Sequence, residues 1–178
     1  SAISNDILTA NVHCSLLEAD PITFELRPYL AVAKPEIKVL ENGNMSMNFE
    51  IRQEAVWDNG TPITAEDVAF TIKTVKNPIV NAAPLRSFFE FVEDVIVDVN
   101  NPKRFAVICN KSYFQAEHVI GTFPIFPAYF YDAQGLMSGF SIPEINYPTN
   151  LKELNTNPRI IDFAEEFNTK YNHEPNMI

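Results

Sequence analysis

A tight turn between two strand-like segments, followed by a capped helix, constrains the fold more than any other part of this sequence. Glu36–Leu40 and Met45–Arg52 flank the turn Glu41-Asn-Gly-Asn44, and Asn and Gly tolerate the positive φ angles that hairpin turns require. In the second segment apolar and polar side chains alternate from Met45 to Arg52. A period of two predicts an antiparallel sheet with one buried face.

The helix that follows has the clearest start signal in the chain. Thr64 can cap the backbone N–H of Asp67, and the Asp67 carboxylate can reach back to Thr64, as in a capping box. Ile63 lies just before the cap and completes a hydrophobic staple with the first helical turn. We expect the helix to end near Asn77-Pro78. It should pack on the sheet through three residues, Val68, Ile72 and Val75.

A second hairpin and two further helices are predicted downstream. Asp94–Val99 and Phe105–Cys109 read as a second antiparallel hairpin of the same sheet, because apolar residues alternate in the first of them. Residues 114–120 predict a short helix. The last helix has Asn157 as its cap and Pro158 in its first position. Its apolar face, which must pack against another element, consists of Ile160, Phe163, Ala164, Phe167 and Tyr171.

The remaining segments carry weaker signals. Apolar residues on one face predict a helix over residues 6–17. Asp20-Pro21 and Arg27-Pro28 predict a turn and an extended linker over residues 18–29. Residues 135–157 are polar and are expected to form an irregular connector.

Composition excludes several classes of function. The 178 residues carry a net charge of −10, which argues against nucleic acid as the partner, since phosphate binding needs clustered Lys and Arg. Hydrophobic residues make up 46%, enough for a packed core, but no apolar run reaches the roughly 18 residues that span a bilayer. The two cysteines, Cys14 and Cys109, lie in apolar contexts and are interpreted as buried free thiols.

The sequence shows no catalytic constellation. It lacks a nucleophile elbow, and its five glycines form no phosphate-binding loop. The three histidines, His13, His118 and His173, have no metal-ligand partner at helical spacing. We therefore expect neither an enzyme nor a bound metal or cofactor. The aromatic clusters at 88–91 and 123–131 are compatible with an apolar ligand wall, but core packing is the better interpretation.

One stretch, Phe49–Phe70, resembles the signature of the family 5 extracellular solute-binding proteins, the peptide-binding components of bacterial ABC importers. The resemblance is specific because order and spacing match over some twenty consecutive positions. The matching residues, whose role is expected to be structural, are Ile51, Arg52, Trp57, Gly60, Pro62, Thr64, Ala65, Glu66, Asp67 and Val68.

This resemblance implies an α+β fold with a mixed, mainly antiparallel sheet and packed helices, part of a periplasmic binding protein-like II clamshell. Members have two lobes and are much longer than this chain, so the chain resembles a piece that lacks the C-terminal lobe. Residues 1–17 then correspond to a fragment of the main lobe, and residues 18–134 to the smaller domain with the signature. Residues 135–178 correspond to a connector and helix that return toward the main lobe.

The resemblance also suggests where a ligand would bind. In oligopeptide-binding relatives the peptide backbone pairs with the chain before the first helix, and a second contact follows the signature helix. At these positions this sequence has Ala2, Ile3 and Ser4, and Leu85, Arg86 and Ser87. Relatives often carry a ligand-facing Tyr where Leu85 stands, so one hydrogen bond to the ligand is lost here.

The function implied is capture of oligopeptides outside the inner membrane and delivery to a permease. The protein would be periplasmic or held at the bacterial envelope, either lipid-anchored or soluble. Its partners would be a peptide, the second lobe of its own chain and an ABC permease, and the isolated piece is expected to self-associate. The alternatives are another solute on the same fold, such as a nickel chelate, haem or an oligosaccharide, or an envelope sensor that does not transport.

Overall fold

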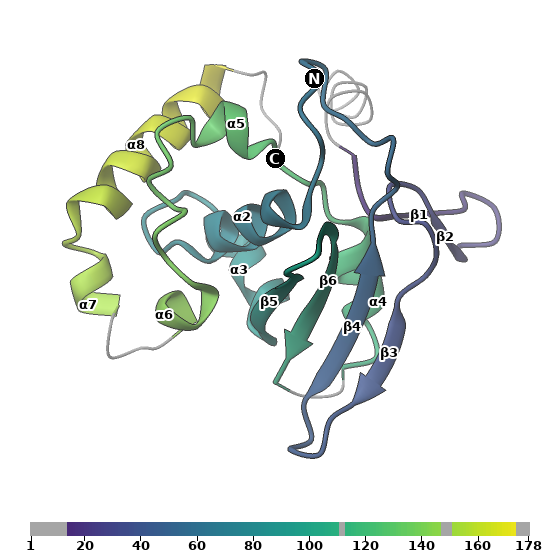
Figure 1. Ribbon diagram of the computed structural model, residues 1–178. Coiled ribbons are helices and arrows are strands. Elements are labelled where there is room, and N and C mark those ends of the chain that lie inside the picture. Colours follow the sequence, from purple (N-terminus) through teal and green to yellow (C-terminus); the bar gives the residue numbers. More distant parts are fainter. Residues whose placement is uncertain (1–13, 111–112, 147–150, 174–178) are drawn as a thin grey trace.

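The structure is a computed structural model that describes residues 14–110, 113–146 and 151–173 (Figure 1). An antiparallel sheet lies on one side of the molecule and a group of helices lies on the other. The strands are β1 (Leu17–Ala19), β2 (Leu26–Pro28), β3 (Glu36–Val39), β4 (Met45–Glu50), β5 (Val92–Asp98) and β6 (Asn101–Cys109). The helices are α2 (Ala65–Lys76), α3 (Ala83–Phe89), α4 (Ala116–Thr122), α5 (Ala128–Tyr131), α6 (Ile142–Asn146), α7 (Leu151–Leu154) and α8 (Pro158–His173).

Both predicted hairpins form and share one sheet. The strand order is β3-β4-β6-β5, and every neighbouring pair is antiparallel. In the register, Met47 on β4 lies between Ile37 on β3 and Val107 on β6. The apolar members of the β4 alternation are buried as expected, and the rings of Phe49 and Phe105 stack across the strands with centroids 5.5 Å apart. The second hairpin is longer than predicted, because β5 begins at Val92 and β6 at Asn101.

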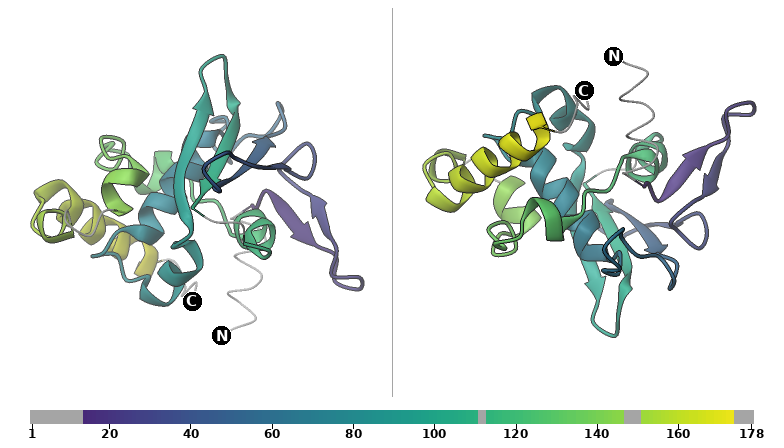
Figure 2. Two further views of the ribbon diagram at one scale, coloured as in Figure 1. Left: turned by 90° about the horizontal axis from the view of Figure 1, so that it is seen from below. Right: turned by 90° about the horizontal axis from the view of Figure 1, so that it is seen from above.

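Helix α2 has the bounds that the sequence predicts, and it lies between the sheet and α8 (Figure 2). Its face with Val68, Ile72 and Val75 is buried in the core that includes the sheet. A different residue of the same helix, Phe70, belongs to a second apolar cluster. Ten of its twelve residues are buried, so α2 is the central layer of the molecule.

The second apolar cluster gives the C-terminal helix its packing partner. Asn157 caps α8 through a bond from the Arg159 N–H to its Oδ1 at 3.0 Å, as the sequence predicts. The Phe163 ring meets Phe70 of α2 edge-on with centroids 5.8 Å apart. The α8 residues buried in this cluster are Ile160, Phe163, Ala164 and Phe167. The fifth residue of the predicted face is Tyr171, whose side chain lies outside the part that the structure describes.

The N-terminal predictions are wrong in part. Residues 6–13 of the expected helix lie outside the described residues, but residues 14–17 are not helical, since Leu17 begins β1. The expected linker over 18–29 contains the two strands of a small hairpin, with Leu17 opposite Pro28. Pro28 is the last residue of β2, and the N–H of the next residue, Tyr29, donates to the Leu16 carbonyl at 3.0 Å. The hairpin forms in place of the helix that the periodicity predicts, because in this conformation Leu16 and Leu17 are completely buried.

The expected irregular connector over 135–157 contains two short helices, α6 and α7. Helix α6 follows a capping box that the sequence carries as Ser141-Ile-Pro-Glu144. The Ser141 N–H donates to the Glu144 carboxylate at 2.7 Å, and the Glu144 N–H donates to the Ser141 hydroxyl at 3.3 Å. The Ser141 hydroxyl also donates to the Glu144 carboxylate at 2.7 Å, and the bonds from the Ser141 N–H and hydroxyl hold the pKa of Glu144 below its usual value.

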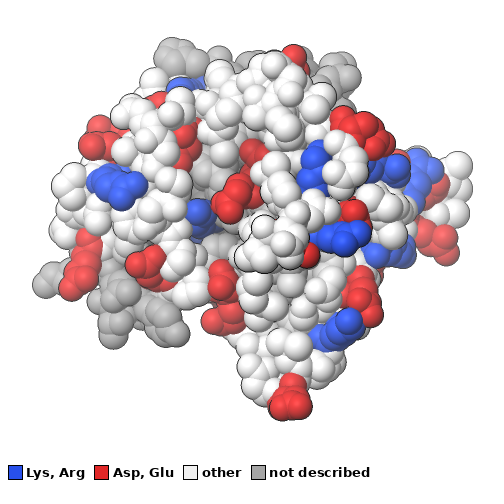
Figure 3. Space-filling view, viewed as in Figure 1, with Lys and Arg blue, Asp and Glu red and all other residues white. Residues whose placement is uncertain are grey.

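The two cysteines differ in exposure. Cys109 is buried and unpaired, and burial raises the pKa of its thiol to about 12. Cys14 is also unpaired but only half-buried, so the expectation of burial is wrong for this residue. Acidic and basic side chains are interspersed over the face of the molecule that Figure 3 shows, without a continuous basic surface on that face. None of the described helices combines the length and the apolar character needed to cross a bilayer.

Candidate functional site

The signature stretch folds into a tight loop that leads from β4 into α2. Val56 and Pro62 form a β-bridge, and the Trp57 N–H donates to the Thr61 carbonyl at 2.8 Å. The loop reverses at Gly60, whose φ of +83° favours glycine, and the Gly60 N–H donates back to the Trp57 carbonyl at 2.9 Å. The glycine of the signature is thus required by backbone conformation.

A buried lysine that sequence reasoning missed fixes the start of this loop. Lys103 on β6 donates from Nζ to the carbonyl oxygens of Arg52 and Ala55, each at 2.9 Å. Burial lowers the pKa of this ammonium group. The sequence signal is a lysine two positions before Phe105, on the same face of the strand. Its two bonds add to those from the N–H groups of Ala55 and Ile63, which the carbonyls of Arg52 and Ala55 also accept.

Asp67 joins the signature helix to the chain before α5. Its Oδ2 accepts the Thr64 N–H at 2.9 Å, and its Oδ1 accepts the Ala128 N–H at 3.1 Å. Burial raises the pKa of this carboxyl, and the two backbone bonds offset only part of that effect. One turn further, the Thr71 hydroxyl accepts the Phe126 N–H at 2.8 Å. The polar residues of the signature helix therefore hold residues 126–128 in place.

Trp57 packs beside this junction. Its indole is buried, and its ring centroid lies 6.5 Å from that of Tyr129. The indole N–H lowers the pKa of nearby Asp67 without forming a hydrogen bond of standard geometry. The Tyr129 hydroxyl donates to the Asp58 carboxylate, which raises the pKa of this phenol to about 12. Trp57 and Asp67 of the signature thus contact the segment of residues 126–129, and the structural role expected of the whole signature stays a prediction.

The expected ligand wall after the signature helix forms α3. Leu85 packs against both apolar clusters, and Ser87 is exposed. The Arg86 guanidinium is turned inward, where it donates to the carbonyls of Asn77 at 3.0 and 3.2 Å, of Pro78 at 3.2 Å and of Val80. Burial lowers the pKa of Arg86. The side chains that α3 presents to solvent include Pro84, Ser87 and Phe88.

The first half of the expected ligand site, Ala2, Ile3 and Ser4, lies outside the described residues. The role of all six positions in ligand binding stays a prediction.

An open groove of about 510 Å³ runs across the outer face of the sheet. Its floor includes an ion pair between Arg104 on β6 and Glu50 on β4, with Nε and Oε2 3.0 Å apart, and its rim includes Lys34 and Asp98. These charges are exposed and largely paired. Among the described residues no group of His, Cys, Asp and Glu has the geometry to hold a metal ion. The groove therefore offers polar contacts and no recognisable chemistry.

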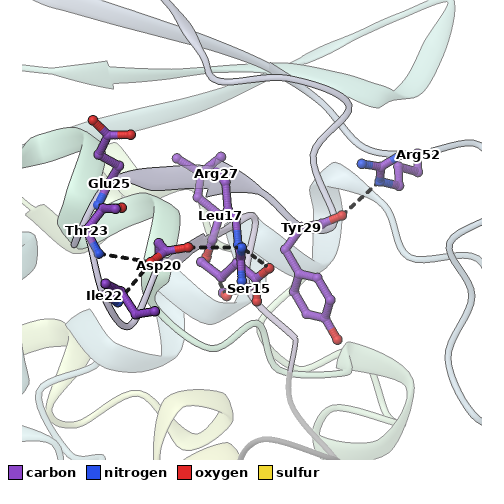
Figure 4. A network of polar contacts seen from close by, with 10 residues as sticks. Ser15, Leu17, Asp20, Ile22, Thr23, Glu25, Arg27, Tyr29 and Arg52 are labelled. Carbon is purple, nitrogen blue, oxygen red and sulfur yellow. Dashed lines mark hydrogen bonds and ion pairs between the residues drawn. The ribbon is translucent and has the colours of Figure 1, made fainter.

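The β1–β2 hairpin is braced by the polar contacts that Figure 4 shows. Asp20 Oδ1 accepts the N–H groups of Ile22 and Thr23 at 2.8 and 2.9 Å, and these bonds lower the pKa of Asp20. Arg27 bridges Glu18 at 2.9 Å and Asp20 at 3.2 Å. The contacts hold Phe24 at a φ of +59°, a conformation that large side chains rarely adopt.

The antiparallel sheet, the helices packed on it and the signature loop agree with the class of protein that the sequence resembles, the solute-binding proteins. The chain belongs to the bacterial extracellular solute-binding proteins, family 5, whose middle-region model matches residues 25–172. These are binding components of ABC transporters and not catalysts, and the family description places them outside the bacterial cell.

Solved structures of other binding proteins share the fold. The oligopeptide-binding protein of Thermus thermophilus, solved with a pentapeptide, matches 96% of this chain at a TM-score of 0.59 and 21% identity. NikZ of Campylobacter jejuni, solved with Ni(L-His), matches 83% at a TM-score of 0.56 and 22% identity. AgaA of A. tumefaciens, solved with agropinic acid, matches 75% at a TM-score of 0.60 and 18% identity.

The chain spans about a quarter of these proteins, with 28%, 25% and 26% of their respective lengths covered. No curated protein matches the sequence.

Proposed function

We propose that this chain contributes one wall of a peptide-binding site in the solute-binding component of an ABC importer. The complete protein would capture oligopeptides outside the inner membrane and pass them to a permease, and it would be soluble in the periplasm or held at the envelope by a lipid. The observation that carries this proposal is the family match over residues 25–172. The pentapeptide complex of the Thermus relative supports a peptide as the ligand.

The chemistry of α3 supports a neutral, extended ligand. The Arg86 side chain is committed to three main-chain carbonyls, so it is not available to pair with an anion. Three side chains of the wall are exposed: the apolar ring of Phe88, the ring of Pro84 and the small hydroxyl of Ser87. Peptide-binding proteins of this kind gain affinity from backbone hydrogen bonds and tolerate varied side chains, which such a wall permits.

A ligand panel separates this proposal from its alternatives. The thermal midpoint of the complete polypeptide that contains these residues is measured with a pool of tri- to pentapeptides, nickel(II)–histidine, EDTA, agropinic acid, haem and an oligosaccharide. A rise with the peptide pool alone is expected. A rise with another compound would assign that solute instead, and no rise with any compound would favour the sensor alternative.

A matched pair of variants tests the wall itself. Phe88→Ala should weaken peptide binding several-fold, because Phe88 is 53% exposed on α3. Phe24→Ala is the control, since Phe24 is an exposed ring in the turn between β1 and β2, outside α3. Equal affinities of the two variants would show that α3 does not contact the ligand.

A further inference from the structure

Strand β3 is an open edge of the four-stranded sheet. The order β3-β4-β6-β5 leaves β3 and β5 at the two edges. The start of β5 is covered, because Asn146 of α6 donates to the carbonyls of Val92 and Glu93 at 3.1 Å. Irregular register at both ends of β5 further blunts that edge. All four residues of β3 are exposed, and no described strand lies on its outer side.

The backbone groups that β3 presents outward can be assigned from the hairpin. The Leu40 N–H donates to the Asn44 carbonyl at 2.7 Å, so hydrogen-bonded pairs recur every second residue from there. Lys38 opposite Ser46 and Glu36 opposite Asn48 are therefore the pairs bonded to β4. The N–H and C=O groups of Ile37 and Val39 point away from β4, toward an additional strand.

The side chains of the edge add apolar area and ordered charge. Ile37 is 46% and Val39 69% exposed, although they lie on the face that buries Met47 and Met45 in the neighbouring strand. On the opposite face, Lys38 Nζ lies 3.0 Å from Glu36 Oε2. Charged residues usually protect an exposed edge from pairing. A Glu and a Lys two residues apart can instead complement a strand that runs antiparallel with the same two charges.

We propose that β3 docks a second copy of this chain, edge to edge and antiparallel, about a two-fold axis at Ile37. This register places Ile37 opposite Ile37 of the partner subunit and Glu36 opposite Lys38 of the partner subunit. It keeps both faces of the sheet continuous, because the directly opposed residues share a face. The two-fold axis brings each charge pair twice, so the Glu-x-Lys order is self-complementary.

The outward backbone groups fit this register. Each Ile37 N–H can donate to the opposite Ile37 carbonyl, and each Val39 N–H can donate to the carbonyl of Pro35 of the partner subunit. Proline lacks an N–H, which limits the ladder to four bonds and ends it at Pro35. The short interface predicts a weak dimer, whose two sheets form one continuous sheet.

Analytical ultracentrifugation of the 178-residue chain over a concentration series tests the proposal, together with variants in which the charges at positions 36 and 38 are reversed. The average mass should rise toward that of a dimer as concentration increases. Lys38→Glu and Glu36→Lys should each weaken association by about tenfold or more, because like charges then face each other. The double variant Glu36→Lys/Lys38→Glu should restore it. A mass that stays monomeric at every concentration, or a double variant no better than the single ones, would overturn the proposal.

Disulfide trapping tests the register. Residues that are directly opposed in a hydrogen-bonded antiparallel pair have Cα atoms about 5.5 Å apart, within the span of a disulfide. Ile37→Cys should therefore form a covalent dimer under mild oxidation, well above the background of the parent chain. Ile96→Cys, exposed on β5, is the control. Equal crosslinking of the two variants would contradict the proposed axis, and circular dichroism verifies that each variant is folded.

Discussion

The Oδ1 of Asp67 accepts the backbone N–H of Ala128 at 3.1 Å, so a residue of the family signature anchors a segment sixty-one positions later in the chain. The same carboxylate caps its own helix through the Thr64 N–H. One side chain thus fixes both the start of α2 and the approach to α5. The acidic residue in the signature is explained by this geometry without any contact to a ligand.

Removal of this carboxylate should destabilise the domain. Asp67→Ala leaves the half-buried N–H groups of Thr64 and Ala128 without their acceptor, and we expect a loss of about 2–4 kcal/mol in the free energy of unfolding. Urea denaturation measures it. Glu66→Ala is the control, because Glu66 is the exposed neighbour and should cost less than about 0.5 kcal/mol. Equal losses for the two variants would mean that the Asp67 bonds are not structural.

The helix cap gives a smaller effect. Thr64→Ala should cost about 1 kcal/mol through loss of the Thr64 side chain from the capping box. Thr61→Ala changes the same side chain at an exposed position of the preceding loop and should be nearly neutral. An unchanged urea midpoint for Thr64→Ala would show that the bond from the Thr64 N–H to Asp67 suffices for capping.

Docking of α8 should make the C-terminal residues part of the same folding unit. Phe163 is fully buried against Phe70, so Phe163→Ala should cost about 3–5 kcal/mol. Glu165→Ala on the exposed face of α8 should have little effect. Far-ultraviolet circular dichroism and tryptophan fluorescence, which reports Trp57 beside the signature helix, should give one coincident transition. Separate transitions would show that α8 unfolds independently.

Lys76 should make stability depend on alkaline pH. Burial lowers the pKa of its ammonium group from 10.5 to about 8, while Glu93 and Glu90 nearby partly oppose the shift. Between about pH 8 and 10.5 the unfolded chain holds a proton that the folded chain has lost, so stability rises with pH. Cys109 has the opposite effect on stability above pH 9.0, the usual pKa of its thiol. Burial keeps the thiol protonated in the folded chain while it is ionised in the unfolded chain, so this group lowers stability as the pH rises.

The contribution of Lys76 is isolated by the variant Lys76→Met. The difference in unfolding free energy between the parent chain and this variant should shift in favour of the parent from about pH 8 to about pH 10. Its Nζ bond to Asn146 Oδ1 at 2.5 Å is lost in the variant at every pH, which moves the whole curve without changing its slope. A difference that does not change with pH would contradict the lowered pKa.

The chain alone should bind peptides weakly. It spans about a quarter of the length of its solved relatives, and we expect α3 to supply only one wall of a site that closes between two lobes. A peptide bound to one wall stays exposed on its other side, and the few contacts do not offset the entropy lost when the peptide is ordered. Dissociation constants should therefore be millimolar or weaker, which corresponds to a binding free energy of about −4 kcal/mol. Calorimetric titration with tri- to pentapeptides measures this. Micromolar binding by a monomer would place the whole site within these residues.

Much of the fold could be predicted because local signals coincide with tertiary packing. The alternation from Met45 to Arg52 and the cap at Thr64 correctly predict β4 and α2. The helix expected through residue 17 is wrong from residue 14 onward, because Leu16 and Leu17 are buried completely by pairing that periodicity does not reveal. The capping box at Ser141 was overlooked among polar residues.

The candidate ligand site stays a prediction. The family resemblance places Leu85, Arg86 and Ser87 after the signature helix, and in the structure they lie on one helix, α3. It could not indicate that the guanidinium turns inward, because its acceptors are main-chain carbonyls of residues 77–80, which no side-chain pattern encodes. The same reason explains why Lys103 was missed, since its partners are also carbonyl oxygens.

The inward turn of Arg86 has a mechanical consequence. Its bonds fasten α3 to the segment that ends α2, and α2 is held on one side by the sheet and on the other by α8. A ligand that binds to α3 as proposed would therefore meet a helix tied to the packed core. If the complete protein closes around that ligand, α3 would move together with the sheet, because the bonds of Arg86 join the two through α2.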